Sequence, residues 1–369
     1  MPTVPKLQRQ YSEDNLEWRD RCDYWSNYRP IKRGRKKKYT FREPLILAGH
    51  GVRISVHRNT LLIRPGLTHF PQYREEIRFF PGDPNLPDRI IVLDASGGIT
   101  FDALSWMSDQ KIAMVQLNWR GQVQFSGNAG FSADPKLVRW QTEIQGSKKA
   151  LQLNQKLIAA KFDACAATLL SIFGNSKNAS EAISKIKFWK SKVLNSTTSN
   201  SHGRILGYEG MAASIYYRTW HDLPLKWAGL WKKPIPTSWA KVGARSMAWQ
   251  RESNNARHPI NAMLNYGYAM LICQVQTELV AAGFDPAIGF AHRRAWNPIP
   301  LVYDLMEPLR PEIDRKILEF SLANTFKPGD FTINGKGGCR LNPEMARVVA
   351  REVSNIEVTP LINSIRSTF

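Results

Sequence analysis

The fold class is most clearly indicated by one segment in the middle of the chain, Leu151-Gln-Leu-Asn-Gln-Lys-Leu-Ile-Ala-Ala-Lys-Phe-Asp-Ala-Cys-Ala-Ala-Thr-Leu-Leu-Ser-Ile-Phe173. Its apolar residues recur with the spacing of one helix face, and Gly174 follows at once, which predicts a long amphipathic helix with a defined end. Further segments have the same spacing. They lie at roughly 179–193, 208–220, 259–282, 300–307, 311–324 and 343–353. Residues 148–325 are therefore expected to form a large helical domain.

The chain ahead of this helix has the pattern of a β domain, residues 44–125. Short aliphatic runs are interrupted by turn residues, with turns expected at Gly49-His-Gly51 and His57-Arg-Asn59. The expected strands are Leu45–Ala48, Val52–Val56, Thr60–Arg64, Ile90–Leu93, Ile112–Leu117 and Gln122–Phe125. Thr100 is expected to cap one short inserted helix. The predicted fold class is α+β, with this β domain followed by a larger all-α C-terminal domain.

Three flanking stretches complete the predicted organisation. Residues 1–43 are polar and aromatic, contain a short predicted helix at 12–28, and end in the basic run Lys32–Lys38. That run is expected to be a solvated tail, with contact to DNA phosphates as the alternative. Residues 126–147 have the composition of a linker. Residues 326–369 form a C-terminal tail with a hairpin-like segment and a helix.

The composition of the chain limits the kinds of binding partner and the cellular compartment that we expect. The chain has 369 residues and a formal net charge of +20, which favours a polyanionic partner, either nucleic acid or an anionic membrane. No basic amphipathic helix stands out, no apolar run is long enough to cross a membrane, and the N-terminus lacks a signal core. The four cysteines form no CxxC pair, which argues against a structural zinc site or a disulfide framework. A soluble, cytoplasmic protein is expected.

Four residues stand out as a candidate site. Asp304 and Glu307 share one face of a predicted helix that is otherwise apolar, where carboxylates are costly to bury unless they are paired or bind a cation. Glu209 begins another mostly apolar helix, and His292 follows Gly289-Phe-Ala in a loop. Carboxylates with one imidazole suit Mg²⁺ or Mn²⁺. The alternatives are a salt bridge or solvated face, a helix-dipole role for Glu209, and an ordinary loop histidine.

Basic and aromatic residues are interleaved around these positions. The arginines are Arg245, Arg251, Arg257, Arg293, Arg294 and Arg310, and the tryptophans are Trp220, Trp227, Trp231, Trp239 and Trp249. Arginines with aromatic rings suit phosphate contact and base stacking. For each single tryptophan, ordinary packing is the alternative. Walker loops, dinucleotide-binding glycine motifs and nucleophile elbows are not found in the sequence.

Four passages together resemble a known family. They are Tyr208-Glu-Gly-Met-Ala-Ala213, His258-Pro-Ile-Asn-Ala-Met-Leu-Asn-Tyr-Gly-Tyr-Ala-Met-Leu271, Gly289-Phe-Ala-His292 and Leu301-Val-Tyr-Asp-Leu-Met-Glu-Pro-Leu-Arg-Pro311. In this order, on a helical domain behind a β domain, they resemble the CRISPR-associated endonuclease and integrase of spacer acquisition, the Cas one family. The resemblance covers roughly residues 44–325.

The resemblance implies a divalent-metal-dependent DNA endonuclease and integrase that acts in antiviral defence. The metal ligands of the family carry over onto Glu209, His292 and Glu307, and Asp304 matches a further acidic residue of the catalytic site. Arg310 matches a basic residue near the DNA. The implied cofactor is Mg²⁺ or Mn²⁺. The implied partners are double-stranded DNA with free 3′ ends, a second copy of the chain, and a dimer of the small protein Cas two.

Three departures from the family pattern leave the partner and the target open. Arg293-Arg-Ala-Trp-Asn-Pro-Ile-Pro300 stands where the family often has a glycine-containing stretch, the segment after Glu209 is long and rich in tryptophan, and residues 1–43 extend beyond the family core. One alternative is a stand-alone or transposon-type integrase that works without the small partner. Another is a DNA-binding scaffold that has no catalytic activity.

Overall fold

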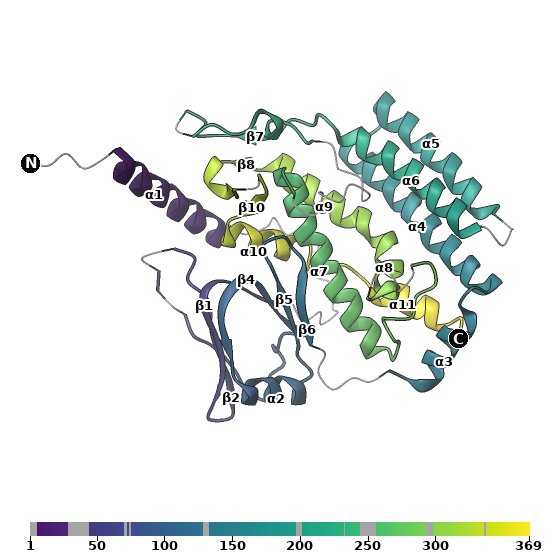
Figure 1. Ribbon diagram of the computed structural model, residues 1–369, viewed down its shortest axis with the longest axis horizontal. Coiled ribbons are helices and arrows are strands. Elements are labelled where there is room, and N and C mark those ends of the chain that lie inside the picture. The colour runs from purple at the N-terminus through teal and green to yellow at the C-terminus, as the bar shows by residue number, and fades with distance from the viewer. Residues whose placement is uncertain are drawn as a thin grey trace, which may run out of the picture.

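The structure is a computed structural model that describes residues 6–28, 44–69, 72–73, 75–127, 133–196, 201–231, 233–243, 256–292, 298–335 and 337–369. In Figure 1 a β-sheet from the first third of the chain lies beside a larger helical part formed mainly by the rest. An N-terminal sheet with one inserted helix and a helical C-terminal part are therefore confirmed. The domain boundaries proposed at 43, 125, 147 and 325 remain predictions.

The sheet separates two cores. Within the described residues its strand order is β3-β2-β1-β4-β5-β6. The strands are β1 (Leu45–His57), β2 (Thr60–Arg64), β3 (Ile77–Phe79), β4 (Arg89–Ile99), β5 (Ala113–Leu117) and β6 (Val123–Gly127). Strand β4 pairs in parallel with β1 and β5, and the other pairs are antiparallel. Along β4, Ile90 and Val92 belong to one core while Ile91 and Leu93 belong to the other, because successive side chains face opposite sides of a strand.

Strand β1 corrects the expectation of a turn at Gly49-His-Gly51. The strand continues through these residues, and its register against β4 shifts on both sides of His50. Gly49 has φ +91°, and a Cβ atom there would lie 2.6 Å from the carbonyl oxygen of Leu67. The glycine therefore permits a bulge and a close backbone approach instead of a chain reversal. Strand β3 has no counterpart among the expected strands.

The inserted helix forms as the sequence predicts. Helix α2 (Phe101–Asp109) begins after Thr100, whose hydroxyl accepts a hydrogen bond from the Ala103 N–H at 3.2 Å. Trp106 and Met107 are buried with the aliphatic residues of β1, β2 and β4. Helix α2 thus covers one face of the sheet and leaves the other face for the C-terminal part (Figure 1).

The C-terminal part is mostly helical, but the all-α expectation is wrong. Its helices are α3 (Pro135–Ile144), α4 (Lys148–Phe173), α5 (Lys177–Leu194), α6 (Ser201–Trp220), α7 (Pro259–Ala281), α8 (Pro300–Met306), α9 (Arg310–Ala323), α10 (Pro343–Glu352) and α11 (Thr359–Arg366). Helix α3 lies within the stretch interpreted as a linker. In the described part of the chain, two short strand pairs interrupt the helices. They are β7 (Lys226–Trp227) with β8 (Thr325–Phe326), and the expected hairpin, β9 (Phe331–Ile333) with β10 (Cys339–Leu341).

Two layers position the candidate site. Helices α4, α5 and α6 pack side by side on the far side of the molecule from the sheet (Figure 1). Helix α7 runs between them and the sheet, and it is buried on all sides, as an apolar central helix should be. Gly121, with φ +72°, lets the β5–β6 turn approach α7, since a Cβ atom there would lie 2.7 Å from the carbonyl carbon of Asn265.

Helix α1 (Lys6–Asn27) ties the N-terminal extension into the fold. Arg21 forms a buried ion pair with Asp330 at 2.6 Å, and the Trp25 indole donates to the same carboxylate at 2.9 Å. Trp18 donates to the carbonyl oxygen of Thr68 at 3.3 Å. The helix predicted at 12–28 is therefore longer than expected and docked. The basic run Lys32–Lys38 lies outside the described residues.

Candidate functional site

The four predicted site residues come from three parts of the helical layer. Glu209 lies on α6, His292 in the loop ahead of α8, Asp304 on α8, and Glu307 at the start of a single 3-10 turn, Glu307–Leu309. Asp304 and Glu307 are buried, at 2% and 5% exposed. Glu209 and His292 are half-buried. The predicted helix 300–307 therefore ends one residue early, and this change places Glu307 at a junction between two helices.

Asp304 holds the histidine loop. Its Oδ2 atom accepts the N–H groups of Phe290 and Ala291 at 2.5 and 3.1 Å, and Oδ1 accepts the His292 N–H at 2.9 Å. Oδ1 also bonds His292 Nδ1 at 2.6 Å. A Cβ atom at Gly289 would lie 2.8 Å from Oδ2, so glycine is needed where the loop wraps the carboxylate. Because Asp304 accepts from Nδ1, the lone pair of the neutral His292 ring lies on Nε2.

The charge on His292 follows from the same contact. The hydrogen bond to Asp304 raises the pKa of His292 above its ordinary value, against the opposing effect of burial. The negative charges of Asp304, Glu307 and Glu209 raise this pKa further. The carboxylates of Glu209 and Glu307 therefore lie close enough to His292 for their charges to affect its protonation.

Lys161 connects the two glutamates. Its ammonium donates to Glu209 Oε1 and, at 2.6 Å, to Glu307 Oε2, and its side chain is 11% exposed. Burial alone would lower the pKa of Lys161, but the adjacent carboxylates of Glu307 and Glu209 raise it well above its usual range. Lys161 was not among the predicted site residues. The sequence does contain an indication of it. Lys161 stands four residues after Leu157 and four before Cys165, and this spacing places it on the apolar face of the helix.

Glu307 has a second cationic partner. Arg310 Nε lies 3.2 Å from Glu307 Oε1, one helical turn along the chain. Burial would raise the pKa of Glu307, but Arg310 and Lys161 together lower it to about 2. Glu307 is therefore ionised at neutral pH even though it is buried.

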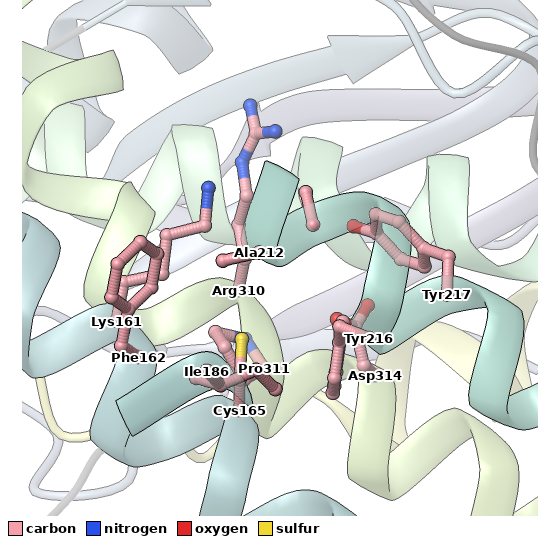
Figure 2. A pocket seen from close by; sticks show the side chains of 11 residues that line it. Lys161, Phe162, Cys165, Ile186, Ala212, Tyr216, Tyr217, Arg310, Pro311 and Asp314 are labelled. Carbon is pink, nitrogen blue, oxygen red and sulfur yellow. The ribbon is translucent and has the colours of Figure 1, made fainter. Parts of the chain in front are cut away.

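Lys161 and Arg310 also border a pocket between α4, α6 and α9. Figure 2 shows both cationic side chains extending in the same direction above an apolar floor. The lining residues are Lys161, Phe162, Cys165, Ile186, Ala212, Ala213, Tyr216, Tyr217, Arg310, Pro311 and Asp314. Two cationic side chains therefore border the pocket, and each of them is paired with Glu307.

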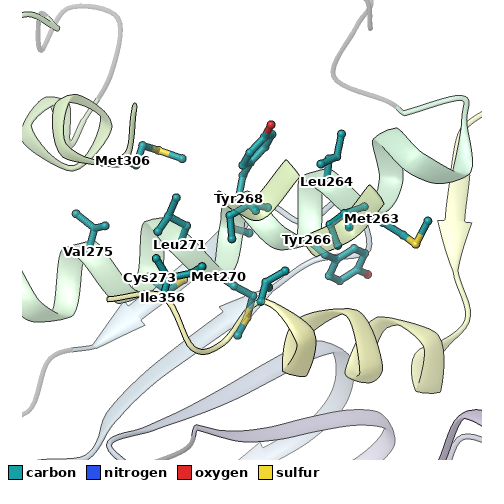
Figure 3. Packing of buried hydrophobic residues seen from close by; sticks show 14 of the residues in the cluster. Met263, Leu264, Tyr266, Tyr268, Met270, Leu271, Cys273, Val275, Met306 and Ile356 are labelled. Carbon is teal, nitrogen blue, oxygen red and sulfur yellow. The ribbon is translucent and has the colours of Figure 1, made fainter. Parts of the chain in front are cut away.

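A buried carboxylate supports this arrangement from below. Asp314 on α9 accepts hydrogen bonds from Tyr216 of α6, at 3.2 Å, and from Tyr268 of α7. The Arg310 guanidinium lies over the Tyr268 ring, 5.2 Å from its centre. In Figure 3 Tyr268 and Tyr266 leave opposite sides of α7, and Tyr268 is on the same side as Met306 of α8. Asp314, which sequence reasoning missed, thus links three helices below the site.

The donor set fits a hard divalent cation. Glu209 and Glu307 already converge on one positive charge, and carboxylates with an imidazole are ligands that Mg²⁺ and Mn²⁺ accept. Across the residues that the structure describes, no three His, Cys, Asp or Glu side chains stand close enough to hold a metal ion jointly. The Lys161 ammonium lies between the carboxylates of Glu209 and Glu307.

The predicted DNA contacts divide into three groups. Arg310 belongs to the site, and Arg257 is exposed near the start of α7. Arg245, Arg251, Arg293 and Arg294 lie outside the described residues. Trp220 and Trp239 are buried at 3% exposure, which corresponds to the packing alternative, whereas Trp231 is 84% exposed. None of the helices in the described ranges combines the length and apolar character of a membrane span.

The geometry defines a class of site, in which carboxylates and an imidazole lie beside cationic side chains in a strongly basic chain. The profile of the family "CRISPR associated protein Cas1" matches residues 45–355, and the chain therefore belongs to the Cas1 (Cas one) family. A relative from Francisella tularensis subsp. novicida, described as "CRISPR-associated endonuclease Cas1 1", is 28% identical over 283 residues. This alignment covers 74% of this chain and 78% of the relative.

Solved structures have the same fold. One is "Casposase bound to integration product", with TM-score 0.70 and 24% identity over 88% of this chain and 89% of that one. Another is a "Cas6-RT-Cas1--Cas2 complex", with TM-score 0.63 and 18% identity. The match covers 92% of this chain but only 36% of that longer chain.

Proposed function

We propose that this protein is a divalent-metal-dependent DNA integrase and endonuclease that inserts short DNA fragments into a CRISPR array. The observation that carries the proposal is the convergence of Glu209, from α6, and Glu307, from the turn after α8, on the Lys161 ammonium. The nearby His292 ring is held by Asp304. Membership of the Cas1 family and the net charge of +20 support a DNA substrate.

Each residue has a definite role in this proposal. Glu209, Glu307 and His292, through Nε2, would hold Mg²⁺ or Mn²⁺, which supplies Lewis-acid stabilisation of the charge that develops at the phosphodiester. Asp304 positions His292 and does not contact the substrate. Arg310 would contact a phosphate, together with Arg245, Arg251, Arg257, Arg293 and Arg294. A DNA 3′-hydroxyl attacks the target phosphorus in line, the P–O3′ bond of the target strand breaks, and the released oxygen becomes a new 3′-hydroxyl by taking up the proton that the attacking hydroxyl loses. The chain therefore needs no nucleophile of its own, and water in place of the DNA hydroxyl would nick the DNA.

The partners are also part of the proposal. Double-stranded DNA with free 3′ ends, a second copy of the chain, and a Cas2 dimer would complete an adaptation complex in the cytoplasm. A second candidate is a transposon-type integrase that needs no Cas2. It rests on helix α1, which precedes the family match at residue 45 and is fixed to the C-terminal part by the buried Arg21–Asp330 pair. A scaffold without catalytic activity is the third candidate, and the intact Asp304–His292 contact argues against it.

Strand transfer tests the proposal directly. Short duplex DNA with free 3′ ends is incubated with supercoiled plasmid, Mn²⁺ and the full-length chain, with and without Cas2. We expect joined products from wild type, no joined products from Glu209→Ala or His292→Ala, and near-normal DNA binding in both variants. His57→Ala, an exposed histidine in the β1–β2 turn, is the matched control and should remain active. Full activity of either site variant would refute the assignment.

A further inference from the structure

Lys161 lies where a cation bound by Glu209 and Glu307 would be expected. It is on the buried face of α4, between Leu157 and Cys165, which are both buried. Its ammonium contacts one oxygen of each glutamate and so bridges α6 and the turn after α8. A lysine is rarely buried to this extent without paired charges. The two carboxylates therefore require a cation between them, and in this structure the chain supplies it.

The Lys161 ammonium opposes the binding of a metal ion to the same two carboxylates. Among the described residues, the ion pairs at Lys161 join two carboxylates, Glu209 and Glu307, to two cationic side chains, Lys161 and Arg310. A divalent ion placed next to an already neutral set would gain little attraction and would be repelled by the ammonium. Arg310 pairs with Oε1 of Glu307 and is 25% exposed, whereas Lys161 joins both carboxylates. Lys161 is therefore the group that the ion must displace.

We propose that Lys161 is a tethered cation that occupies the Glu209–Glu307 pair in the metal-free protein, so that a divalent ion binds only when the ammonium leaves. The inference rests on the proposed function, because it uses the same two carboxylates as metal ligands. Lys161 then has a regulatory role, since it keeps the buried carboxylates paired and raises the ion concentration at which the site fills. The lysine stem is long and flexible, so the ammonium can leave the two carboxylates through rotamer changes. In Figure 2 it extends in the same direction as the Arg310 side chain.

The test is Mn²⁺ binding to the full-length chain without DNA, measured by calorimetry and by the Mn²⁺ resonance signal. Lys161→Met and Lys161→Gln remove the charge, and we expect the Mn²⁺ Kd to fall by about tenfold or more. Lys161→Arg keeps the charge and should bind Mn²⁺ no more tightly than wild type. Lys190→Met is the matched control, because Lys190 pairs with Asp163 of α4 on the surface, and its Kd should be unchanged.

Thermal unfolding gives a second readout. Without metal, Lys161→Met and Lys161→Gln should have a lower Tm than wild type, since two buried carboxylates lose their counter-ion. Saturating Mn²⁺ should raise their Tm by more than it raises that of wild type. Folding that requires Mn²⁺ would support the inference in the same way. Failure of both variants to fold with or without Mn²⁺ would overturn it, because the ammonium would then be a permanent structural partner.

The outcomes separate the inference from the proposed function. Suppose that wild type binds one Mn²⁺ and that Glu307→Gln loses this binding. If the Lys161 variants then bind Mn²⁺ as weakly as wild type or more weakly, the inference is overturned while the metal assignment stands. If neither wild type nor any Lys161 variant bound Mn²⁺, both the metal assignment and the inference would fail. Binding by Lys161→Met or Lys161→Gln when wild type binds poorly would be the strongest support.

Discussion

Replacement of Asp304 by asparagine tests the most tightly built part of the site. The two Asp304 oxygens accept the N–H groups of Phe290, Ala291 and His292 and the His292 ring. The side chain of asparagine has only one oxygen. Its amide nitrogen, which is itself a donor, would replace the second carboxylate oxygen and face other donors. With the amide nitrogen in place of Oδ2, the N–H groups of Phe290 and Ala291 lose their acceptor. With it in place of Oδ1, the His292 N–H loses its acceptor, and the ring keeps a bond only by offering its Nδ1 lone pair.

The structure sets the size of the effect. Each buried donor left without an acceptor costs roughly 1–3 kcal/mol, so one or two of them predict a loss of about 1–6 kcal/mol in the free energy of unfolding. Urea denaturation at pH 7 followed by tryptophan fluorescence measures this loss. Amide exchange at 290–292 should also accelerate, because the carboxylate fixes that loop directly. Strand transfer should fall with it, since the His292 ring loses its orientation.

Asp163→Asn is the matched control for this prediction. Asp163 is 61% exposed and pairs with Lys190 on the surface, so its replacement should change the unfolding free energy by less than about 1 kcal/mol. If Asp304→Asn were as stable as Asp163→Asn, or if it retained full strand transfer, the hydrogen-bond account of the histidine loop would be refuted.

Two further predictions concern other parts of the molecule. Arg21→Met leaves Asp330 buried without its cation and should cost about 3–5 kcal/mol in urea unfolding, and an unchanged midpoint would mean that α1 is not docked. Burial lowers the pKa of His258, which caps α7 by accepting the Ile260 N–H at 3.2 Å. The unfolded chain therefore binds the proton more tightly, and wild-type stability should fall as the pH drops below about 6.5. His258→Asn keeps a good cap and should remove that part of the loss, so equal pH slopes in the two proteins would contradict the assignment.

Local signals predicted the fold well wherever one residue determines the local geometry. Pro259 begins α7 and Gly283, with φ +88°, follows its end, and the Thr100 side chain caps α2, all as the sequence indicates. Gly49 misled the prediction because the same positive φ serves a turn or a bulge, and only the nearby backbone of Leu67 selects the bulge. The β7–β8 pair was not predictable from local pattern, since it joins two-residue strands about a hundred positions apart in sequence.

The candidate site was predictable in its residue types but not in its contacts. Two carboxylates on an apolar helix and a histidine after a glycine loop are visible in the sequence. What separates Asp304 from Glu307 is the path of the 289–292 loop, which turns three N–H groups toward only one of them. Lys161 was missed because its partners come from α6 and from the turn after α8, and helical spacing describes only its own face of α4.

The acidic residues of the site differ in whether their carboxylates can change partners. Asp304 is bound by backbone N–H groups and by a ring anchored on the same loop, so it cannot change partners unless that loop unfolds. Glu209 and Glu307 are bound by Lys161, whose long flexible side chain can exchange partners through rotamer changes alone. We therefore expect an incoming cation to take over the two glutamates but not Asp304. This difference is why we assign Glu209 and Glu307 as ligands and Asp304 as the residue that positions His292.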